Sequence, residues 1–152
     1  MNRAVFALLS LWVAAWGCAG SVDHDGELAR RAGEEFAAAV FVERDFDKGY
    51  SLLADGARRY VTREKFREVI SRLHPGSFPG SVVATDYEPM HGEKALYLYL
   101  IGEAPEEKFY YRLVMEGSAG GTYRPVAVYR SDGPYPPSPD RKKLPARSQA
   151  HP

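Results

Sequence analysis

Cysteine is almost absent from this sequence of 152 residues, in which Cys18 is its one occurrence. A lone cysteine cannot form an internal disulfide, so packing alone must stabilise the fold. The 20 basic and 20 acidic side chains cancel, and the absence of a basic stripe argues against nucleic-acid binding. The four histidines are scattered, without a pair at the spacing of metal ligands. We therefore expect no metal and no cofactor.

Long apolar runs are also scarce in this chain. Its one long apolar run, residues 4–16, follows Asn2 and Arg3 and falls short of the roughly 20 residues that cross a bilayer as a helix. This length is typical of a secretory signal core. The run ends at Ala15-Trp16-Gly17-Cys18, which resembles the lipobox of bacterial lipoproteins.

In that class of proteins, the signal peptide is removed before a cysteine that carries lipid. The resemblance implies that residues 1–17 are a lipoprotein signal peptide and that Cys18 is diacylated on sulfur and then N-acylated. The alternative is ordinary signal cleavage without lipid. Ala19 follows the cysteine, and by resemblance to the enterobacterial sorting rule this favours the outer membrane. Residues 18–25 then form a short tether. We expect an exported, periplasm-facing protein held to the membrane through Cys18.

Residues 26–130 carry the pattern of a folded α+β domain. Apolar residues recur every three or four positions over residues 26–44 and 63–73, which predicts amphipathic helices. Asp45 can cap a short second helix that reaches residue 53, and Thr62 can cap the third. Within the second helix Gly49 predicts a close approach by another backbone. Residues 58–61 are expected to be extended.

Beyond residue 80 the apolar period changes to two, which predicts β-strands. Residues 81–88, the hairpin 94–117 and residues 122–130 form four expected antiparallel strands. In the hairpin Leu96, Leu98 and Leu100 should share one face. Strict alternation in the first strand places Asp86 and Glu88 on one face with Val82 and Ala84.

Proline dominates the region after residue 130. Residues 131–152 contain six prolines and few apolar residues, so we expect a disordered or polyproline-like tail. Its basic run Arg141-Lys142-Lys143, with Arg147, could contact anionic lipid or a cell-wall polymer. The alternative is that these charges are merely solvated.

One set of positions carries a family resemblance: Phe36, Asp45, Phe46, Gly49, Tyr50, Leu52, Leu53, Arg58, Val61, Thr62 and Phe66. With the strands that follow, they resemble the nuclear transport factor 2-like superfamily over about residues 27–130. The resemblance implies a cystatin-like α+β cone, with three helices packed on a curved four-stranded antiparallel sheet. Some members are isomerases, dehydratases or epoxide hydrolases and many only bind, so the fold leaves the activity open.

An acid–base site in such a cone needs an acid or base in an apolar cavity with tyrosine hydroxyls nearby. The candidate acids and bases are His74, Asp86 and Glu88, and the candidate donors are Tyr50, Tyr60, Tyr97, Tyr99 and Tyr111. The alternative is that the two carboxylates are solvated and the tyrosines belong to the core.

The strand tyrosines also permit a binding hypothesis. Tyr97, Tyr99 and Tyr110, with Tyr129, could form an exposed aromatic patch for a protein or glycan. We therefore expect a lipid-anchored envelope domain that binds a partner protein or a small apolar ligand without catalysis. A small isomerase- or dehydratase-like enzyme is the alternative, and a passive envelope component with a functional tail is a third. The oligomeric state is left open.

Overall fold

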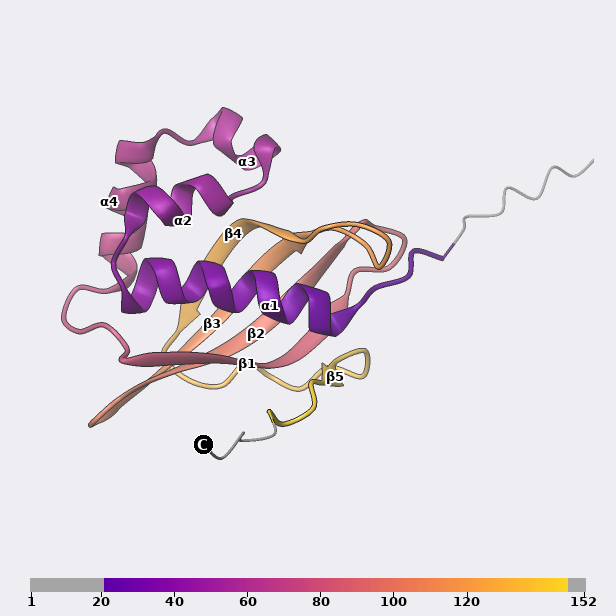
Figure 1. The fold of residues 1–152 in the computed structure, drawn as a ribbon. Helices are drawn as coiled ribbons and strands as arrows, with labels where there is room; N and C mark the ends of the chain where they lie inside the picture. Colours follow the sequence, from indigo (N-terminus) through magenta and orange to yellow (C-terminus); the bar gives the residue numbers. More distant parts are fainter. Residues whose placement is uncertain (1–20, 148–152) are drawn as a thin grey trace, which may run out of the picture.

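The computed structural model describes residues 21–147, which form an α+β fold with helices on one face of a single antiparallel sheet (Figure 1). The expected signal peptide and Cys18 lie outside the described residues. The helical elements are α1 (Gly26–Ala37), a π-helical turn (Ala38–Val42), α2 (Phe46–Leu52), α3 (Asp55–Tyr60) and α4 (Arg63–Leu73). The strands are β1 (Ser81–Pro89), β2 (Ala95–Ala104), β3 (Glu107–Glu116), β4 (Arg124–Ser131) and β5 (Lys142–Lys143).

The strands lie in the order β4-β3-β2-β1-β5, so the α+β prediction is confirmed with five strands in place of four. The predicted hairpin is β2 and β3, paired in continuous register with Leu98 opposite Leu113. The alternate residues of both strands that face the helices are buried, as a period of two requires. This face is the centre of the hydrophobic core.

Helix α1 crosses the buried face of the sheet (Figure 1). The Asp25 carboxylate accepts the backbone N–H groups of Glu27 and Leu28, which satisfies donors that a helix start leaves free. A side-chain carbon at Gly33 would lie 2.1 Å from Leu98 Cδ2. Glycine is therefore required here for α1 to lie this close to the sheet.

The predicted caps of the later helices are confirmed, because Asp45 accepts from Lys48 N and Thr62 accepts from Lys65 N. The extended segment expected at residues 58–61 is wrong, since α3 occupies Asp55–Tyr60. The close neighbour of Gly49 is the Val40 side chain, which would lie 2.2 Å from an added carbon, rather than another backbone. Helix α2 packs on α4 and on the π-helical turn, and α3 lies beside β4 (Figure 1).

Strand β1 departs from strict alternation at Thr85. Ala84 pairs with Leu100, but Asp86 pairs with Tyr99, so Thr85 is an extra residue in a β-bulge. The bulge returns Tyr87 to the helix-facing side with Ala84 and turns Asp86 to the opposite, outer face. The prediction that Asp86 and Glu88 share a face with Val82 and Ala84 is therefore wrong.

The chain after β4 is ordered as far as the structure describes it, so disorder is the wrong prediction for residues 131–147. This segment crosses the outer face and then pairs with β1, where Lys143 stands opposite Asp86. Leu144 is buried and donates its N–H to the bulged Thr85 carbonyl, at 2.9 Å. The segment therefore covers an otherwise open sheet edge.

Two buried charged residues of α1 hold this segment. The Glu34 carboxylate accepts from Ala84 N at 2.9 Å and pairs with Arg147. Arg30 donates to the carbonyl of Pro145 at 2.6 Å. These contacts link α1, the bulge in β1 and the proline-rich segment, and they supply the ordering energy that composition alone does not reveal. Within residues 21–147, no helix has the length and apolarity to span a membrane.

Candidate functional site

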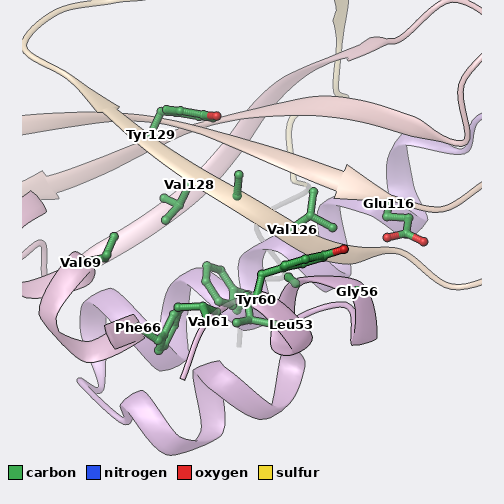
Figure 2. A pocket seen from close by; sticks show the side chains of 13 residues that line it. Leu53, Gly56, Tyr60, Val61, Phe66, Val69, Glu116, Val126, Val128 and Tyr129 are labelled. Atoms are coloured by element: carbon green, nitrogen blue, oxygen red, sulfur yellow. The ribbon is translucent and has the colours of Figure 1, made fainter. Parts of the chain in front are cut away.

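An apolar groove lies between the sheet edge at β4 and the helices beside it (Figure 2). Its volume is about 600 Å³, within the range of small-molecule sites in proteins. Three short segments and two residues behind them form its walls: Gly56, Ala57, Tyr60 and Val61 from α3 and its end, Phe66 and Val69 from α4, Glu116, Val126, Ala127, Val128 and Tyr129 from the sheet, with Phe36 and Leu53.

Backbone hydrogen bonds fix the helical wall of this groove. Ala54 N donates to the carbonyl of Pro125 at 2.9 Å, which joins the start of α3 to β4. At the other end of α3, the Tyr50 hydroxyl donates to the carbonyl of Val61, also at 2.9 Å. Helix α3 is thus held at both ends while the space between it and β4 stays open (Figure 2).

The groove is lined by apolar side chains that remain accessible to solvent. Tyr60 is 93 % exposed, Tyr129 48 % and Val69 36 %, and all three line the one groove, a combination that is typical of a binding surface. Glu116 is the one charged side chain in the lining. This chemistry suits the burial of an apolar molecule and offers no acid–base pair.

His74 lies outside the groove, in the core beneath the loop that follows α4. Its Nδ1 is 3.1 Å from the carbonyl oxygen of Ser77, and its ring stacks on Phe78 with 4.4 Å between ring centres. Because a carbonyl oxygen only accepts, Nδ1 carries the proton, and Nε2 accepts from the Tyr111 hydroxyl at 3.2 Å. Burial lowers the pKa of His74. Both ring nitrogens are thus engaged within the core.

The candidate carboxylates Asp86 and Glu88 also lie outside the groove, on the outer face of the sheet. Glu88 accepts from the Tyr99 hydroxyl at 2.8 Å and from Ser138 Oγ at 2.7 Å. Burial, followed by the hydrogen bond to Glu88, raises the pKa of Tyr99. The structure therefore brings Glu88 to a tyrosine, but the residues after β4 cover the pair.

The three candidate tyrosines of the aromatic patch differ in exposure. Tyr99 is only 7 % exposed, because the Tyr135 ring lies 5.5 Å away and the Arg141 guanidinium carbon lies 3.7 Å from its ring centre. Tyr97 and Tyr110 are half-buried. Tyr97, Tyr99 and Tyr110 therefore do not form a wholly exposed patch.

No known protein family, curated protein or solved structure significantly matches this chain. Its function must therefore be argued from its own geometry. Within residues 21–147, no group of three or more potential ligands is placed to bind a metal ion.

Sequence reasoning did not identify the groove, although it named several of its members. Val69 is one of the apolar residues that predict an amphipathic helix over residues 63–73, a pattern typical of the core, but in the structure it stands at the groove wall. For Tyr60 the sequence predicts only a hydroxyl donor. Helices α3 and α4 are otherwise polar, yet they carry more apolar side chains than the core can bury. This excess is the sequence signal that could have found the site.

Proposed function

We propose that this protein is a non-catalytic binding protein of the cell envelope and that its groove takes a small apolar ligand. The observation that carries the proposal is the groove lining, which is apolar apart from Glu116. A concave apolar site of this volume buries an acyl chain or an aromatic ring system well. The hydrophobic effect then supplies most of the affinity.

An acid–base enzyme would require a buried acid or base inside the same cavity, and Glu116, the one charged side chain of the lining, is exposed to solvent. The three candidates His74, Asp86 and Glu88 all lie elsewhere, and His74 and Glu88 are engaged by neighbours. This arrangement supports binding over catalysis as the role of the groove.

The sequence patterns supply the setting of the proposal. We propose that lipid on Cys18 anchors the protein to the envelope, with the outer membrane favoured over the inner. We further propose that the helices and the sheet form the cone of the nuclear transport factor 2-like superfamily. The α+β layers are compatible with that cone, and its open side would correspond to the groove.

The proposal is tested with the neutral apolar fluorophore N-phenyl-1-naphthylamine, whose emission rises in apolar sites. Gly56 lines the groove, and a side-chain carbon added there meets nothing within 4 Å. Gly56→Trp should therefore fill the groove without disturbing the fold. Gly76, which also has open space around it and lies outside the lining, gives the matched control Gly76→Trp.

We expect saturable binding to the wild type and to Gly76→Trp, and a loss of at least about tenfold in affinity for Gly56→Trp. A tenfold loss corresponds to about 1.4 kcal/mol, a modest share of the apolar burial that the added indole would prevent. The groove is not the site if Gly56→Trp binds the fluorophore as the wild type does. A wild type that does not bind at all contradicts the proposal itself.

A further inference from the structure

Arg112 occupies an unusual position on the outer face of the sheet, next to Tyr129 of the groove lining. It lies on the outer face of β3, directly opposite Tyr129 of β4 in the strand register. Its guanidinium carbon is 4.8 Å from the ring centre of Tyr97, 5.1 Å from that of Tyr129 and 5.2 Å from that of Tyr135. The three tyrosine rings fix the position of this cation and keep it half-buried.

Within residues 21–147, Arg112 takes part in no ion pair and no side-chain hydrogen bond. Its Nε is buried without an acceptor, and the buried hydroxyl of Tyr135 beside it also has no partner. Arg130, by contrast, pairs with Glu107 and donates to the Leu73 carbonyl. A buried donor without an acceptor is costly, so the Arg112 guanidinium can take an acceptor from a bound ligand.

Tyr129 connects this cation to the groove. Its side chain lines the groove and also borders Arg112, and Figure 2 shows it on the opposite side of β4 from Tyr60 and Phe66. An end group that leaves the groove around the β4 edge over Tyr129 therefore arrives beside the guanidinium. At the other end of the groove, Glu116 stands opposite Arg124 in the register. Charges of both signs meet there, so the Tyr129 end is the one that favours an anion.

We propose that Arg112 binds the anionic head of the groove ligand and that this ligand is an aliphatic carboxylate. The inference rests on the proposed function, because the aliphatic chain occupies the same groove. A carboxylate is the head group of choice, since the planar guanidinium presents a fork of donors that matches its two oxygens. The tyrosine rings limit the access of water and so strengthen this charge-assisted hydrogen bonding.

The test compares two ligands that differ in the head group alone, dodecanoate and dodecan-1-ol, as competitors of N-phenyl-1-naphthylamine. Dodecanoate is used below its critical micelle concentration and dodecan-1-ol below its solubility limit. We expect the wild type to bind dodecanoate at least about tenfold more tightly, as a charge-assisted hydrogen bond implies. Arg112→Gln should remove this preference and leave the affinity for dodecan-1-ol unchanged. Arg59→Gln, at an exposed arginine of α3 outside the groove lining, changes the net charge equally and should keep the preference.

The outcomes separate the two proposals. If the fluorophore and both twelve-carbon ligands fail to bind the wild type, the groove is not a ligand site and the inference falls with it. If both ligands bind equally well to the wild type, or if the preference survives in Arg112→Gln, the groove remains and the role of Arg112 is overturned. Arg112→Met, which keeps an apolar stem of similar length, serves as a second variant if Arg112→Gln does not fold by circular dichroism. We expect Arg112→Met also to lose the preference for dodecanoate over dodecan-1-ol. If this variant keeps the preference, the role of Arg112 is overturned.

Discussion

The Nε2 atom of His74 lies 3.2 Å from the hydroxyl oxygen of Tyr111, deep in the core and outside the apolar groove. Burial lowers the pKa of His74 and raises the pKa of Tyr111, so both groups stay neutral near pH 7. The nearby cation Arg130 lowers the pKa of His74 further, while Glu107 opposes it. This pair is a structural element, and the free energy of unfolding falls when the histidine must take a proton.

The first prediction concerns acid stability. Because the pKa of His74 is lower in the folded state, the unfolded state binds a proton first, and the free energy of unfolding should fall as the pH drops below about 6.5. One proton gives a slope of at most about 1.4 kcal/mol per pH unit. Urea unfolding of the wild type and of His74→Gln between pH 7.5 and 5.5 measures this slope. The substitution should flatten it, and an unchanged slope would contradict the assignment.

The second prediction uses two helical glycines with opposite surroundings. An added carbon at Gly49 would lie 2.2 Å from Cγ2 of Val40, which is fully buried and branched. Gly49→Ala should therefore destabilise the fold by about 1–3 kcal/mol through overpacking. Gly56→Ala meets nothing within 4 Å and should stabilise it by about 0.5–1 kcal/mol through the backbone. Thermal unfolding distinguishes the signs, and a stabilising Gly49→Ala would show that α2 does not pack on Val40.

The third prediction concerns the proline-rich segment. Leu144 is only 8 % exposed and contacts the main core, so Leu144→Ala should lower the free energy of unfolding by about 2–3 kcal/mol. Lys142→Ala, at an exposed position of the same β5, is the control and should change it by less than about 0.5 kcal/mol. Amide exchange along β1 should also accelerate in Leu144→Ala. Equal stability of the two variants would mean that the segment is not docked in solution.

The fourth prediction addresses the anchor. The lipobox-like sequence before Cys18 implies a lipid-modified thiol, and each buried methylene contributes roughly 0.8 kcal/mol to membrane binding. Cys18→Ser should therefore move the protein from the membrane fraction to the soluble fraction. Metabolic labelling with a radioactive fatty acid provides the direct measurement. An unlabelled wild type would leave ordinary signal cleavage as the explanation of the N-terminal pattern.

The elements that sequence predicted well are those with strong local signals. Asp45 and Thr62 cap their helices as expected, and the alternation in the hairpin gives the observed pairing of β2 with β3. In each case the residues that set the structure are close in sequence. Local chemistry was therefore sufficient.

The features that sequence missed depend on distant partners. The backbone groups at the Thr85 bulge form hydrogen bonds with Glu34 on one side and Leu144 on the other. The apolar pattern within β1 therefore does not predict the bulge. The segment after β4 obtains its order from the same distant contacts, whereas its composition alone favours disorder. The groove likewise collects residues from α3, α4 and β4. Its existence depends on how far α3 stands from the sheet, which periodicity does not determine.

The pairing of Lys143 with Asp86 also has a consequence for biosynthesis. Strand β1 leaves the ribosome, and on an export route the translocon, well before the residues that cover its edge. During that interval its free N–H and C=O groups can pair with another nascent chain. A chaperone that holds the polypeptide until residue 147 has emerged would therefore raise the yield of correctly folded protein. The gain should be larger here than for a protein in which the next strand along the chain covers the edge of the first strand.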